Sequence, residues 1–347
     1  MNENTYIIGE IGQNHNGSVD IAKLIVELAA RPIVEELFHL QLSPMNAIKM
    51  TKRDLSEELS ASNLRKPYNS VHSFGKNYGE HRAFLELTDE QHYEVFTFAK
   101  EKGLEFVETL CAVKTLSILK LFLPDKLKVA SRDLTNLPLI EALAETKIPI
   151  ILSTGMSGKQ ELDNALTIIS KYHQKISILH CVSEYPTQPV NVNLNTISYL
   201  KENYEEYTIG FSDHTIGISA SVAAVAMGAK IIEKHITIDR RMKGTDQSGS
   251  LGPDGLNRMI RDIRLIELSM GVKEIFICDN VSESKRKLER SIATNKYIKK
   301  GSIIREEDIH LLSPGDGFKW IDRSGIIGKK AKKDLPKDEI IYKDNII

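Results

Sequence analysis

The chain has 347 residues and a formal net charge of −1 at pH 7, with 41% apolar and 27% charged residues. This balance gives no reason to expect nucleic acid or an acidic membrane surface as a partner. No run is long and apolar enough to span a bilayer, and the first residues lack the basic and apolar regions of a signal peptide. Cys111, Cys181 and Cys278 are odd in number and far apart. We therefore expect a cytoplasmic protein with neither a disulfide framework nor a CxxC zinc site.

The first part of the chain predicts a strand, a helix and a second strand, followed by a long connection. The first strand ends near Glu10, Ser18 is placed to cap the helix, and the second strand covers residues 46–50. Residues 51–87 are polar and irregular. Because this stretch is long for a connection inside a compact domain, we interpret it as a functional flap.

From residue 88 a regular alternation of helices and strands begins. Helices are predicted over residues 88–102, 114–122, 136–145, 158–172, 194–203, 218–227 and 253–270. Strands are predicted over residues 104–109, 127–130, 148–153, 176–181, 208–211 and 230–235. The resulting eight strands, separated by helices, indicate a parallel (β/α)8 TIM barrel, with a doubly wound open sheet as the alternative.

The pattern changes after about residue 272. The remaining chain predicts turns followed by short strands, as in Ile298–Ile304 and Leu335–Ile341. We expect a barrel domain over residues 1–275, a linker over 276–290 and a small, mainly β domain over 291–347. At about 60 residues this last domain is marginal alone and should dock on something.

The ends of the predicted barrel strands carry a ring of polar side chains. The ring comprises Glu10, Lys49, Thr109, Lys128, Ser131, Ser153, Thr154, His180, Ser183, Tyr185, Ser212, His214 and His235. Function in a barrel collects at this end. Two ammonium groups, Lys49 and Lys128, with several hydroxyls suit a small phosphorylated anion. The alternative for Lys128 alone is a strand-end lysine that reaches to solvent.

His214 and His235 lie at the ends of neighbouring predicted strands, near Glu10 and Asp213. Each alone could be an ordinary core histidine. As a pair they indicate an open site for a divalent metal, for which imidazole suits Mn, Fe, Co or Zn. Asp246 follows the last strand and is either a ligand of sugar hydroxyls or a solvated loop carboxylate. The remaining histidines are not accompanied by other candidate ligands in the sequence, and we expect them at the surface: His15, His72, His81, His173 and His310.

Several motifs resemble those of the sialic acid synthase family nearly end to end. They are the segments 9–17, 151–156, 179–181, 185–187, 210–215 (Gly-Phe-Ser-Asp-His-Thr) and 233–237 (Glu-Lys-His-Ile-Thr). The segment from about Ser291 resembles the antifreeze-like (SAF) domain of that family. The resemblance implies that phosphoenolpyruvate condenses with the aldehyde of an N-acylhexosamine such as N-acetylmannosamine, giving a nonulosonic acid and phosphate.

The resemblance also implies roles for individual residues and a state of assembly. The residues for phosphoenolpyruvate are Lys49, Thr109, Lys128, Ser131, Ser153, Ser183 and Ser212. His214 and His235 would hold manganese, with magnesium or cobalt as alternatives. Glu10, Tyr185 and Asp246 would orient the sugar, and Asp133 would support the site. The family implies a domain-swapped homodimer, in which the SAF domain of one chain covers the barrel mouth of the other.

The sequence departs from the family pattern at positions that bear on the sugar. Thr51 stands where Gln is usual, Ser183 where Asn is common, and Ser313 where an arginine reaches the N-acyl group. Lys319 or Arg323 could replace that arginine. These changes are compatible with the condensation chemistry, but they leave the identity of the sugar substrate undetermined. Another aldose acceptor, giving a different 2-keto-3-deoxy sugar acid, and a non-catalytic barrel that binds sugars or anions are the alternatives.

Overall fold

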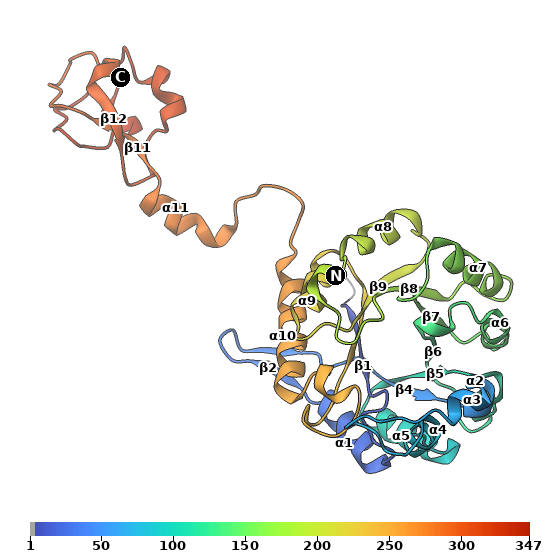
Figure 1. Ribbon diagram of the computed structural model, residues 1–347. Helices are drawn as coiled ribbons and strands as arrows, with labels where there is room; N and C mark the ends of the chain where they lie inside the picture. Colours follow the sequence, from blue (N-terminus) through green and yellow to red (C-terminus); the bar gives the residue numbers. More distant parts are fainter. Residues whose placement is uncertain (1–3) are drawn as a thin grey trace. The chain divides into compact units, whose positions relative to one another are not determined.

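The computed structural model describes residues 4–347, which form two compact units, one up to Gly271 and one over Val272–Ile347. The first is a closed barrel of eight parallel strands (Figure 1). In chain order these are β1 (Tyr6–Glu10), β4 (Ala47–Lys52), β5 (Glu105–Leu110), β6 (Lys126–Val129), β7 (Ile150–Ser153), β8 (Ile176–Cys181), β9 (Thr208–Asp213) and β10 (Ile231–His235). Because β1 pairs with both β4 and β10, the sheet has no free edge. The predicted (β/α)8 barrel is confirmed and the open sheet is wrong.

Helices surround the barrel as an outer ring (Figure 1). They are α1 (Val19–Ala29), α5 (Asp89–Glu101), α6 (Leu137–Glu145), α7 (Lys159–Ile169), α8 (Asn195–Asn203), α9 (Ser219–Ala226) and α10 (Pro253–Ser269). Between β5 and β6 the chain forms a 3-10 helix, η1 (Val113–Lys120), where an α-helix was expected. Further 3-10 turns follow strand ends and loops: η2 (Ser131–Asp133), η3 (Pro189–Asn191) and η4 (Gln247–Gly249).

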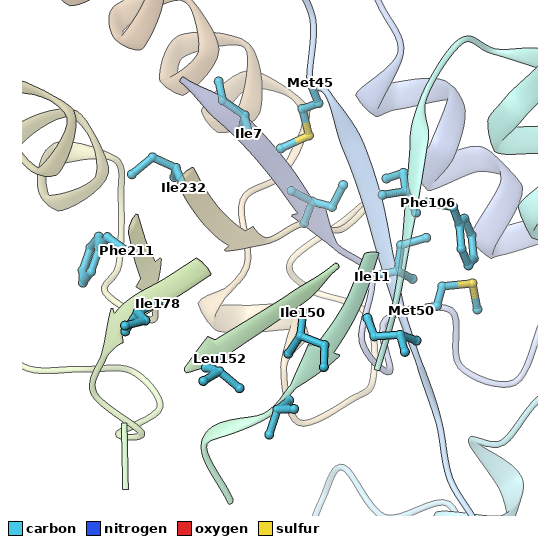
Figure 2. Packing of buried hydrophobic residues seen from close by; sticks show 14 of the residues in the cluster. Ile7, Ile11, Met45, Met50, Phe106, Ile150, Leu152, Ile178, Phe211 and Ile232 are labelled. Carbon is cyan, nitrogen blue, oxygen red and sulfur yellow. The ribbon is translucent and has the colours of Figure 1, made fainter. Parts of the chain in front are cut away.

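Alternating side chains of the strands build two apolar layers. One face of each strand packs against the helices, and Ile7, Phe106 and Leu152, which Figure 2 labels, belong to this layer. The other face fills the barrel interior with Ile8, Ala47, Val107, Ile151, Leu179 and Ile231. Since side chains on a strand alternate between faces, the residue two positions beyond Ile8 also points into the barrel. That residue is Glu10, so the apolar filling gives way to charge at the carboxyl ends of the strands.

Two connections differ from the prediction. A short hairpin of β2 (Ile33–Glu35) and β3 (Leu40–Leu42) precedes β4 and was not predicted. Residues 51–87 contain α2 (Leu55–Glu58), α3 (Ala61–Leu64) and α4 (Tyr78–Phe84), so the expectation of an irregular stretch was wrong in part. Each of the three helices starts at a side-chain cap: Asp54, Ser60 and Asn77. They are too short to show an apolar period in the sequence.

The second unit has its own small core. It contains η5 (Asp279–Val281), α11 (Ser282–Leu288), β11 (Ser291–Thr294), η6 (Glu306–Asp308), β12 (Ile309–Leu312), η7 (Trp320–Gly325) and η8 (Lys343–Asn345). β11 and β12 are antiparallel, and the two repeat-like segments of the sequence meet through a bridge between Ile298 and Leu335. The stretch predicted as a linker, 276–290, contains α11. Among residues 4–347 no helix combines the length and apolarity that a membrane crossing requires.

Candidate active site

A cavity of about 380 Å³ opens at the carboxyl ends of the barrel strands, and every strand contributes a lining residue. Twelve of the thirteen site residues predicted from the sequence line it: Glu10, Lys49, Thr109, Lys128, Ser131, Ser153, Ser183, Tyr185, Ser212, His214, His235 and Asp246. The exception is Asp133, whose carboxylate accepts a hydrogen bond from Arg132 Nε at 3.2 Å. Arg132 itself lines the cavity, so Asp133 contacts a lining residue without lining the cavity itself.

The lining follows from strand geometry. Residues two apart on one strand share a face, and such pairs enter the cavity from successive strands. The pairs are Lys49 with Thr51, Thr109 with Cys111, Lys128 with Ala130, Cys181 with Ser183, Ser212 with His214, and Glu233 with His235. Strand register then places Glu10 opposite both Lys49 and His235. Groups that are far apart in the chain therefore meet at one level of the barrel.

Glu10, Lys49 and Glu233 form a buried charge network at the base of the cavity. Lys49 Nζ lies 2.8 Å from Glu10 Oε2 and 3.5 Å from Glu233 Oε1, and it donates to Thr109 Oγ1 at 3.4 Å. The Ser212 hydroxyl donates to Glu233 Oε1 at 3.0 Å. Although Glu233 stood out at a strand end, the sequence did not assign it to the site. Its place between two lysines makes it part of the cavity.

The two carboxylates of this network titrate differently. Burial raises the pKa of Glu10 to about 7, with Glu233 adding to the effect and Lys49 opposing it. Burial also acts to raise the pKa of Glu233, but Lys128 and Lys49 outweigh it and lower that pKa to about 2. The pKa of Lys49 is raised, because Glu10 and Glu233 overcome the effect of its burial. Lys49 and Glu233 are thus a fixed ion pair at neutral pH.

Lys128 supplies a second buried cation. It is 1% exposed, so the reading of a lysine that reaches to solvent is wrong. Its Nζ donates to the Val129 carbonyl at 3.0 Å, burial lowers its pKa, and no carboxylate of residues 4–347 lies within ion-pair distance. In the same lining, the buried Ser153 Oγ has no hydrogen-bond partner and Ser131 Oγ accepts from the Gly155 N–H at 3.0 Å. A cation and an unpaired hydroxyl in one buried region suit a phosphate or carboxylate ligand.

His214 and His235 face each other with their ring centroids 5.6 Å apart. His214 Nδ1 donates to the Val182 carbonyl at 2.8 Å, which leaves Nε2 as an acceptor, 3.0 Å from the Tyr185 hydroxyl. His235 Nδ1 is buried and has no hydrogen-bond partner in the described part of the chain, and burial lowers the pKa of His235. Imidazole nitrogens such as these are suitable ligands for a divalent metal. No set of three or more His, Cys, Asp or Glu side chains suited to a metal occurs within residues 4–347, so water or substrate would complete the coordination.

Two residues of the predicted strand ends serve the fold instead. The Asp213 carboxylate lies 2.9 Å from Lys234 Nζ and accepts from the Thr215 N–H and the Ser221 hydroxyl, all in the interior. It anchors the end of β9 and does not line the main cavity. His180 Nε2 lies 2.7 Å from the Val192 carbonyl, and its ring stacks on Phe211 outside the cavity. Both were expected near the ligands because residue number alone does not show which face of a strand a side chain takes.

The segment 51–87 gives the cavity a wall that no motif predicted. Its lining residues beyond β4 are Arg53, Tyr68, Tyr78, His81 and Arg82. Arg53 and Arg132 share the Glu58 carboxylate, at 3.1 and 2.9 Å. His81 is only 1% exposed, and His15 only 2%, so the expectation that both lie at the surface was wrong. The available signal was weak, because this unusually long connection carries only three arginines and two tyrosines.

Fold and site together define a class: a (β/α)8 enzyme whose barrel mouth combines a cationic base for an acidic phosphorylated substrate with a pair of facing histidines. Comparison with known proteins agrees with this class. Residues 42–275 match the NeuB family, and residues 289–347 match the SAF domain.

Known synthases resemble this chain in sequence over nearly its whole length, and a solved structure resembles it in fold over most of it. N-acetylneuraminate-9-phosphate synthase from Homo sapiens is 33% identical over 98% of this chain and 92% of its own length. N,N'-diacetyllegionaminic acid synthase from Campylobacter jejuni is 33% identical over 97% of this chain and 98% of its own. The crystal structure of N-acetylneuraminic acid synthetase from Leptospira borgpetersenii, in complex with citrate, aligns with a TM-score of 0.66 at 31% identity, over 82% of this chain and 90% of that chain.

The chain therefore belongs to the NeuB family, and the resemblance seen in its motifs is confirmed. It is a phosphoenolpyruvate-condensing synthase of the transferase type that makes a nonulosonic acid. Enzymes of this family generally depend on a metal, which accords with the unpaired nitrogen of His235.

Proposed function

We propose that this synthase joins phosphoenolpyruvate to the open-chain aldehyde of an N-acylhexosamine of the N-acetylmannosamine type. The supporting observation is that one cavity holds both a cationic base, with Lys49 and Lys128, and the two facing histidines. In the reaction, C3 of phosphoenolpyruvate forms a bond to the aldehyde carbon, whose oxygen takes up a proton. Water adds at C2 and gives up one proton, and the bond between C2 and the phosphate-bearing oxygen then breaks. Inorganic phosphate leaves with that oxygen, and the added hydroxyl loses its proton to become the keto group of the 2-keto acid.

Phosphoenolpyruvate would occupy the base of the cavity. Lys128 and the hydroxyls of Ser131, Ser153 and Ser183 would hold its anionic groups, because they offer a buried charge and unshared donors. Lys49, Thr109 and Ser212 would border the reacting carbons. Glu10 holds Lys49 and Glu233 holds Ser212, while Thr109 accepts a hydrogen bond from Lys49, so little reorganisation is needed when substrate binds.

The acceptor would lie toward the histidines. His214 and His235 would hold the metal, which supplies a Lewis acid for the aldehyde oxygen when bound. We expect manganese, with magnesium and cobalt as alternatives. The Tyr185 ring lies 4.0 Å from the His214 ring, centroid to centroid, and Asp246 lines the same side. With Glu10, these two residues would orient the sugar hydroxyls.

An assay of phosphate release tests this proposal. We expect release from phosphoenolpyruvate only when both an aldose and a divalent metal are present, and loss of release on chelation. Candidate acceptors are N-acetylmannosamine, its 6-phosphate, mannose and di-N-acetylated hexosamines. If mannose alone supported turnover, the alternative with another aldose would replace our proposal, and absence of release with every sugar would refute both.

Variants of the histidines make the assay specific. His214→Ala and His235→Ala should each lower turnover by at least about 100-fold, because loss of a ligand typically costs this much in metal affinity or activity. Both should also bind less metal in equilibrium dialysis. His173→Ala is the matched control, since His173 lies in the connection between α7 and β8, does not line the cavity, and should keep both properties.

We also propose that the chain works as a homodimer in which the SAF region of one chain covers the barrel mouth of the other. Support comes from the family resemblance and from an exposed apolar stretch, Ile275–Ile277, just before α11. Light scattering on the full chain should give twice the mass of 39.0 kDa. A monomer at micromolar concentration would contradict the proposal.

A further inference from the structure

Arg82 is a cavity-lining cation that has no carboxylate partner among residues 4–347. Five Lys and Arg side chains line the cavity, and three of them, Lys49, Arg53 and Arg132, form ion pairs. Within residues 4–347 no acidic oxygen lies in ion-pair distance of Lys128 or Arg82. Lys128 belongs to a barrel strand and points into the base, whereas Arg82 belongs to α4 at the rim. The cavity thus has two unbalanced positive charges on different elements.

Tyr78 holds the Arg82 guanidinium in place without neutralising it. The Tyr78 hydroxyl accepts a hydrogen bond from Nε at 2.9 Å, and the guanidinium carbon lies 5.1 Å from the centre of the Tyr78 ring. No acceptor in the described chain takes a hydrogen bond from Nη1 or Nη2. A planar fork with its two end nitrogens unused is suited to two oxygens of one phosphate group.

His81 adds a neutral donor beside this arginine. The Phe74 N–H donates to His81 Nδ1 at 3.2 Å, so the neutral ring carries its proton on Nε2. Burial, helped by the neighbouring charge of Arg82, lowers the pKa of His81 and keeps the ring neutral. His81 also lines the cavity, and its ring packs between Tyr68 and Phe74. The imidazole is thus rigid and presents a single N–H.

We propose that Arg82, supported by His81, binds a phosphate group on the end of the acceptor that lies farthest from the aldehyde. The acceptor would then be an N-acylhexosamine 6-phosphate, and this inference rests on the proposed function. Three carbons come from phosphoenolpyruvate, so C6 of the hexose becomes C9 of the product. Two separate unpaired cations match two anionic substrates, with phosphoenolpyruvate at Lys128 and the sugar phosphate at Arg82.

The experiment compares two acceptors with the full chain, N-acetylmannosamine and its 6-phosphate, under saturating phosphoenolpyruvate and metal. We expect kcat/KM to favour the phosphorylated sugar by on the order of 10- to 100-fold, the effect of a charge-assisted hydrogen-bond pair. Arg82→Gln should remove most of this preference by raising KM for the 6-phosphate. Arg82→Lys should restore part of it, because the charge returns without the fork.

Arg65→Gln is the matched control, because Arg65 is an exposed arginine of the same segment outside the cavity and should leave the preference unchanged. Protection against thermal unfolding by the 6-phosphate, with and without Arg82, reports binding even if turnover is absent. Phosphate release without a preference would overturn the inference while leaving the proposed function intact. An equal loss on both acceptors in Arg82→Gln would also overturn it, since the arginine would then only support the fold.

Discussion

At the scale of single residues, Glu10 and Glu233 show how environment assigns charge. Both carboxylates are buried in one cavity and contact the same lysine. Glu233 lies near Lys128 as well as Lys49 and accepts from Ser212, so its charge is stabilised well below its ordinary pKa. Glu10 has Lys49 as its main counter-charge, and the neighbouring Glu233 repels its anion. Lys49 and Lys128 thus stabilise a full negative charge on Glu233, but they do not stabilise a second full charge on Glu10 equally well.

His15 gives a pH-dependent prediction for stability. Burial lowers its pKa from 6.5 to about 3, and its Nδ1 accepts from the Gly17 N–H at 3.0 Å. The unfolded chain binds this proton more readily than the folded chain. Stability from this group is therefore complete above pH 6.5 and falls as the pH drops toward 3. At pH 5 the loss is about 2 kcal/mol.

Urea unfolding of wild type and His15→Gln at pH 7 and pH 5 measures this loss. The variant should lose about 2 kcal/mol less than wild type between the two values, because glutamine does not titrate. His39→Gln, at an exposed position of the β2–β3 connection, is the control and should behave as wild type. Equal losses in wild type and His15→Gln would contradict the assignment.

At the scale of elements, the strands and the segment 51–87 contribute in different ways. Side chains alternate between the two faces of each strand. Because Ile8 points into the barrel interior, Glu10, two residues later, points the same way and lines the cavity. The segment 51–87 is held by a cluster of aromatic rings, including Phe74 stacked on Phe84 with centroids 4.7 Å apart. His72 Nδ1 accepts from the Gly244 N–H, which ties the segment to the loop that carries Asp246. Strands therefore supply the base of the cavity and packed connections supply its wall.

The capping box of α5 gives a prediction at this scale. The Thr88 hydroxyl accepts from the Gln91 N–H at 3.2 Å, and the Gln91 side chain accepts from the Thr88 N–H at 2.8 Å. Thr88→Ala should lower the free energy of unfolding by about 1 kcal/mol, because the Gln91 N–H loses its acceptor at the start of the helix. Thr97→Ala, at an exposed position of the same helix, should change it by less than about 0.5 kcal/mol. Denaturant unfolding followed by circular dichroism distinguishes the two, and equal effects would rule out a role for the cap.

At the scale of the whole molecule, the two units have separate cores. The core of the first unit contains no residue beyond Ile263, whereas the core of the second runs from Ile292 to Ile341. A defect in one core should therefore remain local unless the two units unfold together.

Ile341, which is fully buried, provides the test of this independence. Ile341→Ala should destabilise the second unit by about 2–5 kcal/mol, because it removes apolar contacts and leaves a cavity. Hydrogen exchange followed by mass spectrometry should show faster exchange in β11 and β12 and unchanged exchange in β1 and β10. Ile321→Ala, at a position 84% exposed, is the control and should leave all four strands unchanged. Faster exchange in the barrel strands of Ile341→Ala would show that the units are coupled.

The sequence by itself determined the barrel and most of its polar mouth. Alternating strand and helix patterns, with apolar strands ending at groups such as Lys49, Ser153 and His235, follow from local periodicity and the burial of parallel strands. Twelve of the thirteen predicted residues line the cavity, because the carboxyl ends of the strands must meet once the sheet closes. The roles of those residues remain proposals.

Only the tertiary structure decided which polar groups pair with each other and which remain unpaired. Asp213 has Lys234 as its partner, although the sequence places it beside His214. His81, expected at the surface, is buried in the wall, and Arg82 beside it is left without a counter-charge. The physical reason is that pairing and burial depend on the distance between segments far apart in the chain, which local periodicity does not contain. The barrel was therefore predictable from local patterns, whereas the charge balance of its cavity was not.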